Sequence, residues 1–328
     1  MLHRFAQLVA ACTVLLLLAG SLVTSTGSGL SVPDWPTTYG WNMFTFPPSK
    51  WVGGIFYEHG HRLIASSVGL LTIVLTAWLW RADSRLWMKR LGVAALAAVI
   101  LQGVLGGLTV LFFLPAAIST AHAALAEIFF CLTVAIALFT SPRWSSGDDR
   151  IDDRMLRRLS TATVVLIFVQ ILVGALMRHT DAGLAIPDFP WMFGGVVPDH
   201  WTGRIAVHFA HRVGALIVTL TVFATAAHTG YHHRGRTLLT RPAGVIAALV
   251  VVQVTLGALT VLTRRDVWIN SVHLVCGALV LATSIVIALR AWRVRFSLAD
   301  PGLDQTRELA DRLQQPAQTA VEPSGARA

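Results

Sequence analysis

Long runs of apolar residues, separated by short polar segments, dominate the hydrophobic pattern of this chain. Eight such runs lie near residues 8–24, 55–80, 91–113, 117–140, 158–177, 204–227, 243–263 and 267–292. Each has about the 20 residues that a helix needs to cross roughly 30 Å of hydrocarbon. The pattern therefore predicts an all-α polytopic membrane protein with eight transmembrane helices.

The composition agrees with this class of protein. Hydrophobic residues make up 55% of the 328 residues and charged residues only 13%, which is too little charge to cover the surface of a soluble protein of this length. The first apolar run follows His3 and Arg4 and resembles a secretory signal. Because the fifth run has the same place before a similar loop, we expect the first run to stay as a helix.

The net charge of +9 could suggest a nucleic-acid partner, but the positions of the basic residues indicate a membrane topology. Sixteen of them fall on one side of the predicted membrane: Arg4, Arg81, Arg85, Lys89, Arg90, Arg143, Arg150, Arg154, Arg157, Arg158, Arg234, Arg236, Arg241, Arg290, Arg293 and Arg295. The other side has seven: Lys50, Arg62, Arg178, Arg204, Arg212, Arg264 and Arg265. The positive-inside rule then places both termini in the cytoplasm, and we expect membrane lipid, not nucleic acid, around the protein.

The chain also contains an internal repeat. Residues 18–36 (LAGSLVTSTGSGLSVPDWP) align without a gap to residues 172–190 (LVGALMRHTDAGLAIPDFP), and LGGLTVL at 105–111 returns as LGALTVL at 256–262. We interpret the repeat as two duplicated four-helix bundles. The predicted domains are an N-terminal half at 1–140, a cytoplasmic linker at 141–158, a C-terminal half at 159–296 and a mobile cytoplasmic tail at 297–328, with a short helix near 306–314.

Each half carries two histidines at corresponding places. His61 and His122 belong to the first half, and His211 and His273 to the second. All four stand near the outer ends of apolar runs, where a polar ring is costly unless it has a function. Facing helices of a bundle can present one imidazole to each side of a haem iron. The pattern therefore predicts two bis-histidine haem sites toward the outer face.

The two halves differ three residues before the first histidine of each pair. The first half has Glu58 there, and the second half has His208. Positions i and i+3 share a helix face, so Glu58 should lie one turn from His61 and close to a bound porphyrin. This asymmetry suggests that one half performs chemistry while the other holds a redox cofactor. The alternative is a structural Glu58 that pairs with Arg62.

The long outer loops, residues 25–54 and 178–203, are rich in Gly, Pro and Trp. Asp34 and Trp35 in the first loop are candidates for haem or loop contacts. Arg62 and Arg212 could bind haem propionates, although snorkelling to the interface explains them equally well. Other histidines and two glutamines in the apolar runs have structural interpretations. We expect His59, His179, His200 and His208 to be loop or interface residues, and His228, His232 and His233 to be solvated. Gln102 and Gln253 are expected to serve helix packing.

The three cysteines, Cys12, Cys131 and Cys276, lie inside apolar runs and form no CxxC or CxxCH motif. The sequence therefore predicts neither covalent haem attachment nor a zinc site.

The motifs together resemble the haem A synthase family, membrane enzymes that oxidise a methyl group of haem O to the formyl group of haem A. The resemblance covers roughly residues 5–293. The motifs that carry it are GSGLSVPDWP in the first outer loop, EHGHR at 58–62, His122, HFAHR at 208–212 and NSVH at 270–273.

The resemblance implies a role for each half. The N-terminal half would bind the substrate haem O through His61 and His122, with Glu58 as the catalytic carboxylate. The C-terminal half would hold a permanent haem b through His211 and His273. It further implies a bacterial inner-membrane location, a haem O synthase (farnesyltransferase) as supplier and cytochrome oxidase assembly as destination.

The sequence departs from this family in one respect. Many bacterial members carry a cysteine pair around the Pro-Asp-Trp-Pro segment, where this chain has Val32 before it and Thr37, Thr38 and Tyr39 after it. A disulfide relay through this loop is therefore excluded, and the electron donor or acceptor is unknown. Two other functions stay open: a dihaem electron-transfer cytochrome that works with quinone, and a non-catalytic haem transporter or chaperone.

Overall fold

The computed structural model describes residues 1–145 and 151–298 of the chain. Within these residues the fold consists of helices, with no β-strand beyond two isolated bridges in loops. Eight helices are long and apolar enough to cross a membrane. They are α1 (Leu2–Ser25), α2 (Gly54–Ala82), α3 (Leu86–Leu111), α4 (Ala116–Phe139), α6 (Arg154–His179), α7 (Gly203–His232), α8 (Thr237–Leu262) and α9 (Val267–Leu298). The prediction of an all-α membrane protein with eight spans is confirmed.

Most helices extend a few residues beyond the apolar runs that predicted them. α6 begins at Arg154, inside the predicted linker, because the carboxylate of Asp153 caps it by accepting a hydrogen bond from Leu156 N–H at 2.9 Å. A short helix, α5 (Pro142–Ser145), lies in the same linker. The predicted tail lies outside the described residues, except for 297–298 at the end of α9.

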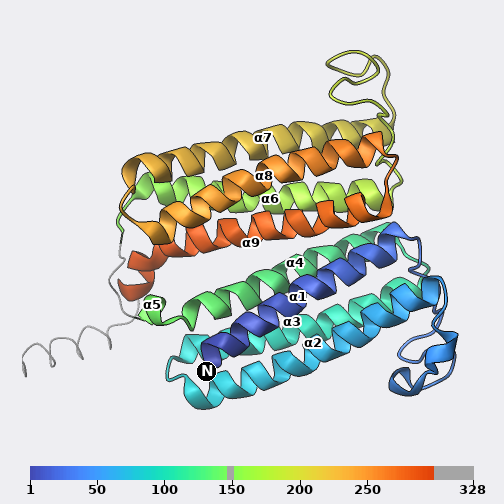
Figure 1. Cartoon of the computed structure of the whole chain (residues 1–328), viewed down its shortest axis with the longest axis horizontal. Helices are drawn as coiled ribbons and strands as arrows, with labels where there is room; N and C mark the ends of the chain where they lie inside the picture. Colours follow the sequence, from blue (N-terminus) through green and yellow to red (C-terminus); the bar gives the residue numbers. More distant parts are fainter. Residues whose placement is uncertain (146–150, 299–328) are drawn as a thin grey trace, which may run out of the picture.

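The eight long helices form two four-helix groups that lie side by side (Figure 1). In the first group α1 packs against α2 and α4, and α3 packs against the same two helices. In the second group α6 and α8 each pack against α7 and α9. α2 and α4 are therefore diagonal partners across the first group, and α7 and α9 are diagonal partners across the second.

Helices α1 and α4 of the first group meet α6 and α9 of the second. At one end of this contact the hydroxyl of Ser25 lies at the centre of a polar cluster. It accepts hydrogen bonds from Arg178 at 3.2 Å, Asn270 at 3.1 Å and Ser271 at 2.9 Å. Interhelical hydrogen bonds of this kind help hold helices together where lipid provides no hydrophobic driving force.

The bundle has two distinct ends. The loop end carries the two long loops, residues 26–53 and 180–202, and the terminal end carries the start of α1, the end of α9 and residues 140–145 and 151–153 (Figure 1). Large apolar side chains on the helix flanks between the two ends are exposed, among them Leu70, Ile100, Leu216 and Leu220 at 60–63%. Exposed apolar surface of this extent suits contact with lipid.

The two long loops contain the same turn at matching places. Tyr39 and Gly40 in the first loop, and Phe193 and Gly194 in the second, all have φ between 51° and 79°. Backbone bridges Thr38–Trp41 and Met192–Gly195 close the two turns. Two successive residues with positive φ are typical of a type I′ turn. Glycine suits the second of these positions because it adopts positive φ without strain.

Candidate functional site

The four predicted haem-binding histidines lie at a similar depth below the loop end. His61 is the eighth residue of α2 and His122 the seventh of α4, while His211 is the ninth of α7 and His273 the seventh of α9. Each pair comes from the diagonal helices of one four-helix group. The members of each pair are close enough to interact electrostatically. The structure thus brings together the pairs that the sequence predicted.

Each of these imidazoles rests against a glycine on a neighbouring helix. A β-carbon built on Gly20 would lie 3.0 Å from Cε1 of His61, and one on Gly106 would lie 3.2 Å from Cε1 of His122. The corresponding distances are 3.0 Å for Gly174 and His211, and 3.1 Å for Gly257 and His273. Contacts this short are tighter than nine in ten of those that real β-carbons make. A larger residue at any of the four places would therefore make the imidazole shift by a few tenths of an ångström.

Two glutamines on adjacent helices contact these histidines through their side chains. The side-chain amide of Gln102 donates to the carbonyl of His122 at 2.9 Å, and that of Gln170 donates to the carbonyl of His211 at 2.7 Å. The amide nitrogen of Gln170 also lies 3.0 Å from Nδ1 of His211. These contacts fix the orientation of the helix turn that carries each ring, which is how outer contacts tune a metal ligand.

The fourth ring is oriented by backbone. Nδ1 of His273 donates to the carbonyl of Gln253 at 3.1 Å, so the neutral imidazole keeps its lone pair on Nε2, the nitrogen free to bind a metal. In the first half, Nδ1 of His61 and Nδ1 of His122 are buried without a hydrogen-bond partner among the described residues, and Nε2 of His122 lies 3.4 Å from the amide nitrogen of Gln102. Buried polar atoms without a partner need an explanation, and a ligand that completes the site is one. Each pair therefore offers imidazole nitrogens to a haem iron.

Glu58 lies one turn before His61 and is 3% exposed. Its Oε1 pairs with the guanidinium of Arg62 at 2.7 Å, and its Oε2 accepts from the backbone N–H of Val32 at 2.8 Å. Arg62 also donates to the carbonyls of Val32, Asp34 and Thr37. The buried ion pair therefore attaches the first long loop to α2.

The second half uses a neutral ring at this place. His208 lies 3.2 Å from Ile186 N–H through Nδ1 and 3.2 Å from Nε of Arg212 through Nε2. Arg212 donates to the carbonyls of Ile186, Asp188 and Trp191 in the second long loop. A neutral imidazole accepts through only one nitrogen, whereas a carboxylate satisfies both donors. Among the described residues, the pair of Glu58 and Arg62 has no acidic counterpart in the second half.

The other two candidate residues of the first loop have separate roles. The carboxylate of Asp34 accepts from the backbone N–H groups of Tyr39 and Gly40, both at 2.8 Å, and from the hydroxyl of Thr37. Asp34 is therefore occupied in shaping its own loop. Trp35 packs on α3, where a β-carbon on Gly107 would clash with its indole ring. This contact places Trp35 over the helix that supports His122.

Glu127, on α4 one helical turn beyond His122, was not singled out from the sequence. It is 4% exposed, and its Oε2 has no hydrogen-bond partner within the part of the chain that the structure describes. An intramembrane carboxyl group of this kind is costly. Counting charges inside the apolar runs would have found it. Gln170 was missed because it has no counterpart in the first half, where Leu16 stands at the aligned position.

The expectation that His228 and His233 are solvated is wrong. Both rings are largely buried and hydrogen-bond to the carboxylate of Asp153. The expectation failed because the start of α6 folds against the end of α7 at the terminal end. His232 is exposed, as expected.

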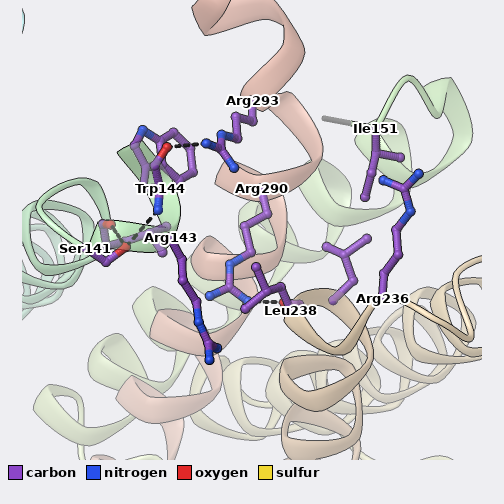
Figure 2. A pocket seen from close by; sticks show the side chains of 10 residues that line it. Ser141, Arg143, Trp144, Ile151, Arg236, Leu238, Arg290 and Arg293 are labelled. Carbon is purple, nitrogen blue, oxygen red and sulfur yellow. Dashed lines mark hydrogen bonds between the residues drawn. The ribbon is translucent and has the colours of Figure 1, made fainter. Parts of the chain in front are cut away.

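A pocket at the terminal end, shown in Figure 2, is not the histidine site. Arg143, Arg236, Arg290 and Arg293 line it, and Arg293 donates to the carbonyl of Trp144 (Figure 2). Arg290 donates to the carbonyl of Leu238, which Pro242 leaves without its usual helical partner, because proline has no N–H to donate four residues on. Arg290 thus supports the backbone where α8 begins.

Comparisons with known proteins give one consistent result. Residues 50–285 match the COX15-CtaA family, described as cytochrome oxidase assembly protein. The chain is 27% identical to the haem A synthase of Geobacillus kaustophilus over 311 residues, which cover 91% of this chain and 95% of the relative. It is 29% identical to the haem A synthase of Shouchella clausii over 269 residues, 80% and 87% of the two chains. A third relative, the haem A synthase of Halalkalibacterium halodurans, is 28% identical over 300 residues, 88% and 97%.

Proposed function

Since the chain belongs to the COX15-CtaA family of cytochrome oxidase assembly proteins, we propose that it is a haem A synthase. It would oxidise a methyl group of haem O to a formyl group and so supply haem A to cytochrome oxidase. The relatives named haem A synthase align with this chain over nearly their whole length. This coverage supports the proposal that the chain has the same activity.

The observation that carries this proposal is the pair of glycine-cradled histidines in each half. His61 and His122 would bind the iron of haem O as substrate, and His211 and His273 would hold haem b. The bound haem b would supply one-electron redox chemistry. The glycines opposite each ring support this assignment, because the same close approach of a helix to an imidazole recurs at all four histidines.

The difference between the halves supports our assignment of the chemistry to the first half. Glu58 is the buried carboxylate on the same helix face as His61, and the described part of the second half has none at the equivalent place. Oxidation of a methyl group to a formyl group takes up an oxygen atom from water or an oxygen species and releases protons and electrons. The electrons would pass through haem b to an acceptor outside this chain. Glu58 would take a proton beside the reacting methyl group. On protonation it would give up its ion pair with Arg62.

Through the ion pair with Arg62, Glu58 would also hold the first long loop over the substrate site. The guanidinium of Arg62 and the carboxylate of Glu58 hold residues 32–37 of the first loop over the end of α2. The loop would thereby exclude bulk water from the substrate, which strengthens electrostatic interactions inside the site.

We place the histidine end of the bundle on the outer face of the bacterial inner membrane. Of the lysines and arginines that the structure describes, fifteen belong to the terminal end and seven to the loop end. By the positive-inside rule the terminal end then faces the cytoplasm. A haem O synthase (farnesyltransferase) in the same membrane would be the source of substrate.

The test is co-expression with a haem O-producing farnesyltransferase in a host that makes no haem A. Haems extracted from the purified protein would be separated by chromatography. Haem A or partly oxidised haem O beside haem b is the expected result. Haem b with only unmodified haem O, in cells supplied with oxygen, would point to a haem carrier, and two equivalents of haem b would point to an electron-transfer cytochrome.

A further inference from the structure

Three metal-binding side chains meet at the terminal end of the second four-helix group, away from the two histidine pairs. They are Asp153, His228 and His233, and one ligand atom from each lies within 4.8 Å of the other two. Nε2 of His228 is 2.8 Å from Oδ2 of Asp153, and Nε2 of His233 is 2.9 Å from the same oxygen. We propose that these residues bind a divalent transition metal, with Zn²⁺ as the fitting ion.

The spacing of the ligand atoms suits such an ion. Zinc bonds to histidine nitrogen and carboxylate oxygen are about 2.0–2.2 Å long, so neighbouring ligand atoms of a tetrahedral site stand roughly 3.3 Å apart. The two nitrogen–oxygen distances need to open by only a few tenths of an ångström. Two imidazoles and one carboxylate leave one position for water, as zinc sites with three protein ligands do.

The carboxylate is already oriented for this role. Oδ1 of Asp153 accepts from the backbone N–H of Leu156 as the N-cap of α6, which leaves Oδ2 directed at the two histidines. The neighbouring Asp152 pairs instead with Arg157 at 2.7 Å. A backbone donor on the non-ligating oxygen is the kind of outer contact that fixes a metal ligand in place.

The end of α7 brings the two imidazoles to one side. His233 follows His228 by five positions, which on a continuous helix would point the two rings apart. However, α7 ends at His232, and His233 caps it with φ −127° and ψ 33°. The chain therefore turns at His233 and its ring comes back beside that of His228, at a centroid distance of 6.2 Å. The ring of His232 packs against that of His228 at 4.5 Å, but His232 is not in the group of described residues whose ligand atoms meet.

The site is shielded from solvent, because the three side chains are only 10–18% exposed. A bound ion would tie the start of α6 to the end of α7.

The experiment uses the full-length protein in detergent, loaded with haem and purified without a histidine tag. After treatment with a chelator, Co²⁺ would be titrated as a spectroscopic probe, and Zn²⁺ content would be measured by mass spectrometry after dialysis. We expect one Co²⁺ per chain with the visible absorption of a low-symmetry nitrogen–oxygen site, displaced by Zn²⁺.

Asp153→Asn, His228→Gln and His233→Gln should each weaken Co²⁺ binding by about tenfold or more. Asn still caps α6, so Asp153→Asn removes the ligand charge without removing the cap. His232→Gln is the matched control and should bind as wild type does. Circular dichroism would confirm that each variant keeps its helices. Absence of stoichiometric metal in the wild type, or unchanged binding in all three ligand variants, would overturn the proposal.

Discussion

Glu58 and His208 hold corresponding places in the two halves, and each contacts a loop N–H group and an arginine, but with different side-chain chemistry. Glu58 accepts from Val32 N–H at 2.8 Å and from Arg62 at 2.7 Å, while His208 lies 3.2 Å from both Ile186 N–H and Nε of Arg212. The carboxylate of Glu58 can accept from both donors and carries a negative charge, whereas a neutral imidazole can accept from only one of them. The first half therefore has a buried, charge-paired acid one turn from a predicted haem ligand, and the second half has a neutral ring.

The C-terminal half should lose its cofactor when a ligand is removed. Replacing His211 or His273 by Ala takes one axial imidazole from a site built for two, so haem b should become high-spin or be lost on purification. The absorption spectrum of the reduced protein measures this directly. If both variants keep a low-spin spectrum and full haem content, the assignment of these two ligands is wrong.

The glycine cradle can be tested with a matched pair of substitutions on one helix. A β-carbon at Gly257 would meet His273 at 3.1 Å, whereas one at Gly244 would meet nothing within 4 Å. Overpacking costs about 1–3 kcal/mol, which corresponds to roughly tenfold or more in affinity. Gly257→Ala should therefore lower haem b retention or shift its spectrum, and Gly244→Ala should not. Equal behaviour of the two variants would remove the cradle from the account.

The first long loop should loosen in acid. Burial raises the pKa of Asp34, but hydrogen bonds from Gly40, Thr37 and Tyr39 outweigh burial and hold the pKa below its usual value of 3.8. A carboxyl with a lowered folded-state pKa stabilises the fold above the unfolded pKa, and this contribution is lost as the pH falls below 3.8 through the folded pKa.

Hydrogen exchange at the amides of Tyr39 and Gly40, corrected for the intrinsic effect of pH, is the measurement. Wild type should lose protection below pH 3.8, and Asp34→Asn should start with less protection and change little on acidification. An acid response of the same size in Asp34→Asn would assign the loosening to another group.

Topology can be checked at two glycines in loops at opposite ends of the bundle. A reporter fused after Gly235, between α7 and α8, should indicate the cytoplasm, and one fused after Gly195, in the second long loop, should indicate the opposite face. A β-carbon at Gly235 would meet nothing within 4 Å, so that loop has space for the fusion. Signals from the same face at both positions would contradict the orientation that we propose.

The sequence predicted the helices well because each apolar run is long and uninterrupted, and hydrocarbon thickness then sets the length. It predicted the start of α6 poorly, because the basic residues from Arg154 to Arg158 read as linker while Asp153 in fact caps a helix there. Local capping, and not hydrophobicity, decides where that helix begins.

The site was predicted in part. Repetition singled out the four histidines and the place shared by Glu58 and His208. What repetition could not show is the cradle, since Gly20 and His61 come from different helices and their contact depends on packing. The cluster of Asp153, His228 and His233 was missed for the same reason: its members stand 75 and 80 residues apart and form no local motif.

The central claim is that Glu58 serves the oxidation of haem O, and the haem A yield of Glu58→Gln tests it most directly. Gln keeps the shape and can still accept from Val32 N–H, but it cannot pair with Arg62 or take a proton. His208→Gln is the control in the second half. After co-expression with a haem O-producing farnesyltransferase, extracted haems would be quantified as haem A per haem b. We expect Glu58→Gln to keep haem b and make little or no haem A, while His208→Gln makes near-normal amounts. Near-normal haem A from Glu58→Gln would contradict the account and leave Glu58 as a structural partner of Arg62.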